Sequence, residues 1–84
     1  MIGDNIRIFF ARSKLRLEVL KKLAEKPQIA SFLAKDMKKH REVISRIFLD
    51  LKEEGLSKCI NPQDPHFRKY KITKEGEEIL RELS

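Results

Sequence analysis

The segment SFLAKDMKKHREVISRIFLDLKEEGL, residues 31–56, decides the fold because it contains two helical patterns joined by a short basic turn. In its second half, apolar residues recur at the i, i+3, i+4 and i+7 positions of one helix face: Ile44, Ile47, Phe48 and Leu51. This stripe predicts an amphipathic helix over about residues 40–54. A shorter helix is expected after Ser31, a good N-cap residue. Its predicted inward face consists of Leu33, Ala34 and Met37.

The charges of the helix over residues 40–54 run against the helix dipole. Basic residues crowd its N-terminal half and the turn before it: Lys38, Lys39, Arg41 and Arg46. Acidic residues follow in its C-terminal half: Asp50, Glu53 and Glu54. A helix dipole favours the opposite arrangement by about 0.3–1 kcal/mol per charge, so these charges do not stabilise the helix. A polyanion at the N-terminal end would explain them, and an ordinary solvated face is the alternative interpretation.

Two helical patterns precede this segment. Residues 5–11 fit a helix better than a short strand, with Asp4 or Asn5 as the N-cap. A further pattern starts after Ser13, another N-cap residue, and Pro27 ends it. Its apolar positions are Leu15, Val19, Leu20 and Leu23. The two patterns form either separate helices or one continuous helix.

The chain changes its period after the segment. Gly55 stands where a left-handed residue is expected at a helix C-terminus, and Leu56 can fold back on the last turn. Residues 58–60 and 68–72 are short β-like runs, and the loop NPQDPHF between them predicts a two-stranded hairpin. Thr73 is the expected N-cap of a last helix. One side of that helix carries Ile79, Leu80 and Leu83.

Composition limits the class of protein. The 84 residues predict a single domain, 1–84, and the formal net charge of +6 favours nucleic acid or acidic membrane surfaces as partners. No apolar run approaches the roughly 18 residues that span a bilayer, and the N-terminus lacks a signal-peptide pattern, so a cytoplasmic protein without a membrane partner is expected. The only cysteine, Cys59, cannot form an internal disulfide, so the fold depends on packing.

The predicted order of helix, helix, helix, two-stranded ribbon and helix resembles the winged helix-turn-helix of ArsR- and MarR-like transcription regulators, in particular small single-domain members common in archaea. SKLRLEVLKKL, residues 13–23, resembles the first helix of that family. Residues 33–56 resemble the pattern "IA…L…VSR…L…GL", and YKITKEGEEIL, residues 70–80, resembles "Y.LT..G…L". The resemblance implies a mainly α fold with a two-stranded β wing, and a sequence-specific transcriptional regulator that binds double-stranded DNA.

The turn before the predicted recognition helix departs from the family pattern. Lys38 stands where the family often has glycine, and Lys39 stands where an apolar residue is common, which predicts a turn of different shape. His40 replaces the usual serine or threonine N-cap, so it is expected to cap weakly and to contact a DNA phosphate instead.

The resemblance implies that residues 40–54 lie in the major groove and that the wing, residues 57–72, lies on the flanking backbone. The residues expected to read bases are Arg41, Glu42, Ser45 and Arg46. Arginine can donate two hydrogen bonds to guanine, and glutamate can accept one from cytosine. For Arg46 the alternative is an ion pair with Glu42 or Asp50. The residues expected to bind phosphate are Lys38, Lys39, His40, Lys58, Arg68, Lys69 and Lys71.

No metal site, cofactor or enzymatic activity is expected. His40, Cys59 and His66 lack the paired spacing of metal ligands, so structural and loop roles are favoured for them. No nucleophile has a visible base partner, and the chain has no glycine-rich phosphate loop.

A homodimer is expected, with Phe9, Phe10 and the last helix as its interface, and the alternative is that they only close the core of the monomer. Leu49 is apolar on the outward face of its helix, so it needs either the wing or another surface. The alternative function is a winged-helix protein-interaction module of a transcription or replication complex. An RNA-binding domain is less favoured, since only Phe67 and Tyr70 lie near the wing as stacking residues.

Overall fold

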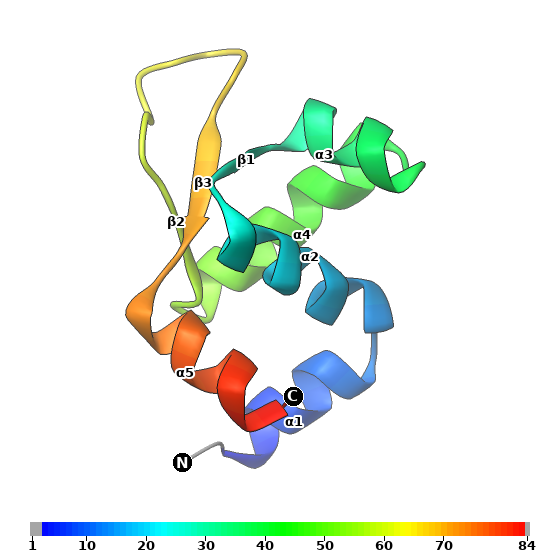
Figure 1. Cartoon of the computed structure of the whole chain (residues 1–84), viewed down its shortest axis with the longest axis vertical. Helices are drawn as coiled ribbons and strands as arrows, with labels where there is room; N and C mark the ends of the chain where they lie inside the picture. The colour runs from blue at the N-terminus through cyan, green and yellow to red at the C-terminus, as the bar shows by residue number, and fades with distance from the viewer. Residues whose placement is uncertain (1–2, 84) are drawn as a thin grey trace.

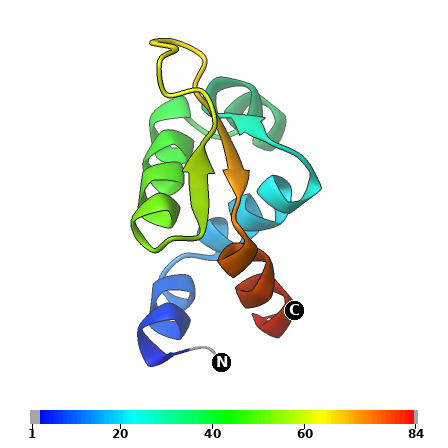
Figure 2. The same ribbon diagram turned by 90° about the vertical axis from the view of Figure 1, so that its left-hand side faces the viewer.

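The structure, a computed structural model, describes residues 3–83 as five helices and a small antiparallel sheet (Figure 1). In chain order the elements are α1 (Asp4–Ala11), α2 (Lys14–Glu25), β1 (Gln28–Ile29), α3 (Ala30–Met37), α4 (Arg41–Glu53), β2 (Ser57–Cys59), β3 (Lys69–Ile72) and α5 (Lys74–Leu83). Both ribbon views place α1 and α5 at one end of the molecule and the loop between β2 and β3 at the other (Figures 1 and 2).

The sheet has three strands within the described residues, one more than the predicted two-stranded ribbon. Its order is β1-β3-β2, and both pairs are antiparallel. β2 and β3 form the expected hairpin, with Cys59 opposite Tyr70, and β1 pairs with the other edge of β3, with Gln28 opposite Tyr70. The strands expected over 58–60 and 68–72 differ from the structure by one residue at their ends.

The short strand β1 also changes the start of α3. The helix begins at Ala30 and its N-cap is Ile29, so the prediction that Ser31 caps this helix is wrong. Pairing with β3 keeps the backbone extended through Ile29, and the chain enters the helix directly from the strand. Helix start signals in a sequence describe local capping, whereas here a distant strand fixes the boundary.

The N-terminal helices α1 and α2 are separate. Neither Asp4 nor Asn5 caps α1, because Gly3 occupies the N-cap position without a side-chain hydrogen bond, and that prediction is wrong. Ser13 is confirmed as the N-cap of α2, since its hydroxyl accepts a hydrogen bond from the Arg16 N–H at 3.4 Å.

The core is built from one face of α2, α3 and α4 against the sheet. The predicted stripe of α4 is confirmed, because all four of its residues are buried: Ile44, Ile47, Phe48 and Leu51. The other helices contribute Val19, Leu20, Leu23, Leu33 and Ala34. The rings of Phe48 and Tyr70 lie 5.0 Å apart between their centroids and join α4 to the sheet. Burial of each large apolar side chain contributes about 1.5–3 kcal/mol, so this face sets the position of α4.

Gly55 ends α4 as predicted, in a left-handed conformation with φ of +77°. Its N–H donates to the Lys52 carbonyl at 3.0 Å, and the Leu56 N–H donates to the Leu51 carbonyl at 2.9 Å. These two bonds satisfy carbonyl groups that the helix end would otherwise leave without partners. The chain therefore turns sharply from α4 into β2.

Thr73 is confirmed as the residue that caps α5. Its hydroxyl accepts from the Gly76 N–H at 3.0 Å and donates to the Gly55 carbonyl at 2.6 Å. The same side chain thus begins α5 and ties it to the end of α4. The predicted apolar side of α5 packs against the core through half-buried residues: Ile79, Leu80 and Leu83.

Candidate nucleic-acid interface

The turn between α3 and α4 closes through a lysine in a conformation that favours glycine. Lys38 has φ of 58° and ψ of 46°, in the left-handed region. Its N–H donates to the Lys35 carbonyl at 3.3 Å, and the Lys39 N–H donates to the Ala34 carbonyl at 2.8 Å. These are the bonds of a common helix C-terminal motif in which the left-handed residue is usually glycine. The turn therefore keeps the geometry that glycine usually adopts, so the prediction of a different shape is wrong, and lysine at this position adds strain and a charge.

The left-handed Lys38 predicts that Lys38→Gly will stabilise the protein by about 1 kcal/mol, because a side chain disfavours this conformation by about that amount. Urea denaturation followed by circular dichroism measures the free energy of unfolding. Lys39→Gly is the matched control, since it removes the same charge at a neighbouring residue whose φ is not positive. Equal changes for both variants would contradict the conformational explanation.

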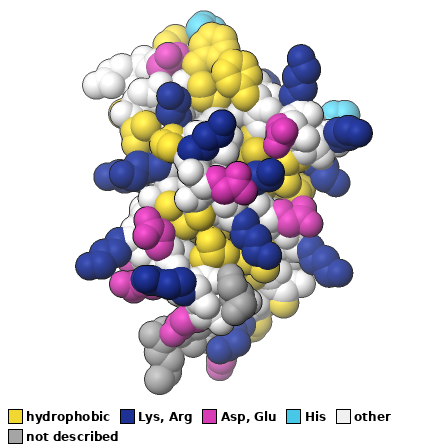
Figure 3. Space-filling model, in the orientation of Figure 1, with side chains coloured by type: hydrophobic (Ala, Val, Ile, Leu, Met, Phe, Trp, Pro, Cys, Tyr) yellow, Lys and Arg dark blue, Asp and Glu magenta, His cyan; other side chains and the backbone are white. Residues whose placement is uncertain are grey.

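The N-terminal end of α4 presents four consecutive basic or titratable side chains to solvent. Lys38, Lys39, His40 and Arg41 are all exposed. His40 is the N-cap of α4 and makes no side-chain capping hydrogen bond, as expected of a weak cap. Figure 3 shows basic side chains around the edge of the molecule where α3 and α4 meet in Figure 1. This edge can accept an anion without displacing a packed side chain.

The residues predicted to read bases lie on two flanks of α4. Arg41 and Ser45 line a cleft of about 280 Å³ between α4, the start of α3 and the β2–β3 loop. Glu42 and Arg46 line a separate, shallow surface on the other flank, beside the start of α2. Leu49 is 41% exposed and lines the first cleft, so its neighbour is the hairpin. The four residues therefore share the exposed part of α4, but two of them line the surface beside the hairpin and two line the surface beside α2.

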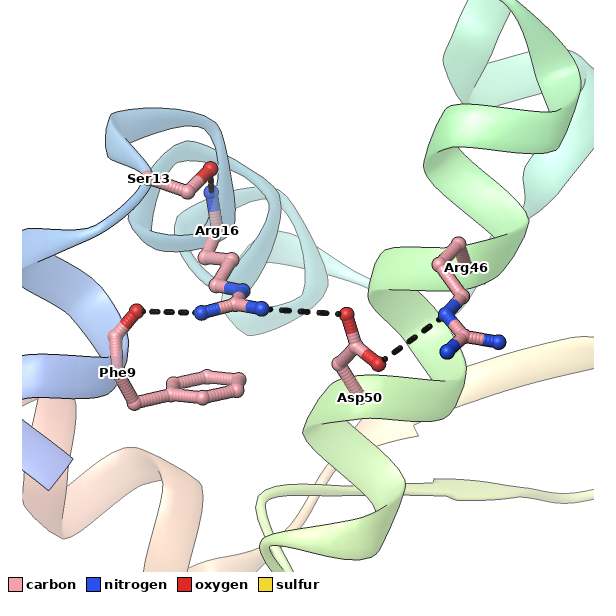
Figure 4. Close-up of polar contacts among 5 residues, drawn as sticks. All are labelled: Phe9, Ser13, Arg16, Arg46 and Asp50. Carbon is pink, nitrogen blue, oxygen red and sulfur yellow. Dashed lines mark hydrogen bonds and ion pairs between the residues drawn. The ribbon is translucent and has the colours of Figure 1, made fainter. Parts of the chain in front are cut away.

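Arg46 belongs to a chain of polar contacts that crosses from α4 to α1 (Figure 4). Its Nε lies 3.5 Å from Asp50 Oδ1, which is the ion pair considered as an alternative to groove contact. Asp50 Oδ2 also accepts from a terminal nitrogen of Arg16 at 3.5 Å, and another Arg16 nitrogen donates to the Phe9 carbonyl at 2.8 Å. The Arg16 guanidinium stacks 4.1 Å from the centre of the Phe9 ring.

This network holds Asp50 more firmly than Arg46. The Asp50 side chain is 19% exposed and that of Arg46 is 78% exposed, so their ion pair is largely screened by solvent. Arg16 lies in the segment 13–23 that resembles the family's first helix, and no pattern in the sequence predicts its contact with Asp50. A contact between residues 34 positions apart depends on how α2 packs against α4.

The loop of the hairpin is ordered by the side chains of Asn61 and Asp64. Asn61 Oδ1 accepts from the Lys69 N–H at 2.6 Å, and Asn61 Nδ2 donates to the Phe67 carbonyl at 2.9 Å. Asp64 Oδ1 accepts from the N–H groups of His66 and Phe67 at 2.9 and 2.8 Å. These backbone bonds stabilise the carboxylate and lower the pKa of Asp64 below its usual value.

The hairpin places the predicted phosphate-binding residues on two faces, because side chains alternate along a strand. Arg68 lines the cleft beside α4, and its Nε donates to the Asp64 carbonyl at 3.2 Å. Tyr70 is buried, whereas Lys69 and Lys71 are exposed on the outer face of the hairpin. Lys58 lies directly opposite Lys71 in β2 and shares that face.

Like charges directly opposite each other destabilise a sheet, so the pair of Lys58 and Lys71 does not stabilise the fold. The basic residues at the N-terminal end of α4 are likewise placed where they do not stabilise their helix. These two lysines share a surface cleft with Glu75 and Glu77 of α5, whose carboxylates offset part of the positive charge. Lys69 is nearer to the loop and is not part of that cleft.

Cys59 and the two histidines do not form a metal site with other residues of the described chain. No group of three His, Cys, Asp or Glu side chains within residues 3–83 could hold a metal ion. The Cys59 thiol is half-buried and donates to Asn61 Oδ1 at 3.7 Å. No helix among the same residues is both long and apolar enough to cross a membrane.

Comparison with known proteins leaves the family open. The chain matches no protein-family model and no curated protein. The resemblance of its motifs to ArsR- and MarR-like regulators therefore stays a prediction from the sequence.

Proposed function

We propose that this protein is a sequence-specific, double-stranded DNA-binding transcriptional regulator with a winged helix-turn-helix fold. In this proposal α4 lies in the major groove, and the hairpin of β2 and β3 is the wing on the flanking backbone. The observation that carries it is the exposed cationic N-terminal half of α4 beside a cleft that it shares with the hairpin. Arg41 and Ser45 line this cleft from α4, and His66 and Arg68 line it from the loop.

The two flanks of α4 suggest different roles in the groove. Arg41 and Ser45 would read bases on the side of the wing, and Glu42 and Arg46 would read bases on the side of α2. The α3–α4 turn would hold the phosphates next to the helix N-terminus through Lys38, Lys39 and His40. In the wing, Arg68 would contact phosphate from the cleft, and Lys58, Lys69 and Lys71 would contact it from the outer face.

We further propose that the regulator is a homodimer whose contacts come from α1 and α5, at the end of the molecule opposite the hairpin loop (Figure 2). Phe10 is buried in the monomer, and the ring of Phe9 packs edge-on against it with centroids 5.0 Å apart, so these two residues mainly close the core. Ile8 is 51% exposed on α1 and remains available for a partner copy.

A protein-interaction module is the second function that a specific observation favours. Val43 and Leu49 on α4 are each 41% exposed, and they would give such a module apolar side chains for contact with a protein partner. A basic α4 surface favours DNA as the partner.

Binding to a mixture of random duplexes at low salt, measured by electrophoretic mobility shift, tests the proposal. We expect a shift that weakens as salt is added. Selection of bound sites from a random duplex library then tests sequence specificity, and paired half-sites would support the homodimer. If the protein shifts no duplex at low salt, the proposal is contradicted. The protein-interaction module would then be the favoured function.

The cleft-facing position of Arg68 predicts that Arg68→Ala will flatten the salt dependence of duplex binding. Loss of one phosphate contact reduces the slope of log K against log salt by about 0.9. Fluorescence anisotropy with one duplex over a range of salt concentrations measures this slope. Lys21→Ala is the matched control, because Lys21 is an exposed cation on α2, outside the cleft, the hairpin and the proposed dimer contacts of α1 and α5. An unchanged slope for Arg68→Ala would remove this residue from the phosphate contacts.

A further inference from the structure

Two exposed aromatic side chains, one from α3 and one from the loop of the hairpin, lie outside the hydrophobic core. Phe32 from α3 is 61% exposed and Phe67 from the loop is 50% exposed, yet their ring centroids lie only 6.2 Å apart with an angle of 34° between the rings. Two segments distant in sequence thus form one continuous aromatic surface. Figure 3 shows hydrophobic side chains grouped at the end of the molecule that the hairpin loop occupies in Figure 1.

Phe67 is held in this exposed position by its backbone. Its N–H donates to Asp64 at 2.8 Å, and its carbonyl accepts from Asn61 at 2.9 Å. The ring is therefore presented by an ordered loop, so binding a ligand there requires little loss of backbone freedom. Ile60 is 45% exposed, and its N–H donates to the carbonyl of Lys69, which places it beside Lys69 at the loop end of the hairpin.

The charges around the aromatic pair indicate what kind of ligand fits it. Between residues 57 and 72 the chain has four cations, Lys58, Arg68, Lys69 and Lys71, and one acid, Asp64. The Asp64 carboxylate already accepts hydrogen bonds from two backbone N–H groups of the loop through Oδ1. Exposed aromatic rings next to cations form the binding surface of proteins that hold single-stranded nucleic acid, where bases stack on the rings and phosphates meet the cations.

We propose that Phe32, Ile60 and Phe67 form a stacking surface for unpaired bases of single-stranded DNA, with Lys69 on the adjoining phosphate. The choice of DNA rests on the function proposed above, and the stacking surface itself is a separate site, since none of these residues lines the cleft between α4 and the loop. The single strand would therefore share Lys69 with the proposed duplex contacts of the wing but would not occupy the cleft beside α4.

Two other occupants fit the observations less well. Three exposed apolar side chains are too few for a stable interface between two copies, which buries about 1,200–2,000 Å². An apolar protein partner would gain nothing from the excess of cations beside the rings, whereas a polyanion would.

Fluorescence anisotropy of a labelled oligothymidine of about 12 nucleotides tests the proposal directly. We expect wild-type protein to bind it and the double variant Phe32→Leu with Phe67→Leu to bind it at least about tenfold more weakly, because leucine preserves apolar surface but cannot stack on a base. Ala24→Ser is the control for a conservative change at an exposed residue elsewhere, on α2. Thermal unfolding by circular dichroism confirms that each variant is folded.

The same proteins are measured on a random duplex. The double variant Arg41→Ala with Arg46→Ala should weaken duplex binding and leave oligothymidine binding within about twofold of wild type. The phenylalanine double variant should weaken oligothymidine binding and leave duplex binding within about twofold. If wild-type protein binds duplex but not oligothymidine, the stacking surface is overturned. If wild-type protein binds oligothymidine but not duplex, the proposed function is overturned. Unchanged oligothymidine affinity in the double variant also overturns the stacking surface. If the only effect of the double variant is a change in self-association, measured by sedimentation velocity, the stacking surface is also overturned.

Discussion

Replacing Gly76 by alanine will lower the free energy of unfolding by about 2–3 kcal/mol, the cost of forcing an extra methyl group into a closely packed position. Gly76 is buried in the first turn of α5, next to the carbonyl group of Leu56. A Cβ there would overlap that carbonyl and lie 2.7 Å from Ile72 Cγ1. Leu56 is fixed by the turn that ends α4, and its carbonyl already accepts the Thr73 N–H at 3.0 Å, so the backbone cannot easily move away.

Urea denaturation of Gly76→Ala measures this loss, with Gly55→Ala as the matched control. Gly55 has a positive φ but open space around it, so alanine there meets only backbone strain of about 1 kcal/mol. If Gly76→Ala is no less stable than Gly55→Ala, then α5 can shift and the close approach is not a constraint. The expected result would explain why a residue without a side chain stands at this position of the stretch YKITKEGEEIL, because α5 approaches the end of α4 at Gly76.

The parts of the fold that depend on local pattern could be predicted from the sequence. The burial of Ile44, Ile47, Phe48 and Leu51 followed from helical period alone, and Gly55 and Thr73 were found because helix ends need particular residues. The strand β1 was missed because two residues carry no periodicity and pair with a strand about 40 positions later. Missing β1 also misplaced the start of α3, since the strand continues directly into the helix.

The candidate site was predictable in composition but not in geometry. The sequence indicated which residues of α4 are exposed, and the structure agrees for Arg41, Glu42 and Arg46, with Ser45 half-buried. It did not indicate that these residues divide between two flanks, because that depends on where the hairpin and α2 lie. Phe32 was likewise missed as a neighbour of Phe67, although an apolar residue just outside the predicted inward face of α3 was a signal.

Arg46→Ala will weaken binding to a selected DNA site by about tenfold or more, whereas binding to random duplex will fall much less. A bidentate contact between arginine and guanine contributes about 1–3 kcal/mol of discrimination, and loss of a phosphate contact would lower both affinities alike. The Nε of Arg46 is the atom that meets Asp50, and the side chain that carries the two terminal nitrogens is 78% exposed (Figure 4). Arg46 can therefore stay paired with Asp50 through Nε while its two terminal nitrogens donate to guanine O6 and N7.

Two companion variants separate this role from a general effect of charge. Lys52→Ala removes one exposed cation from the last turn of α4, so the ratio of the two affinities should not change. Asp50→Asn keeps the size of the side chain but weakens its hold on Arg46, so discrimination should fall although the arginine is still present. The Arg46 ion pair is too exposed to affect stability by more than about 0.5 kcal/mol, so unfolding curves of Arg46→Ala should match wild type. Equal losses on selected and random duplex would show that Arg46 contacts phosphate, and base reading would then depend on Arg41, Glu42 and Ser45.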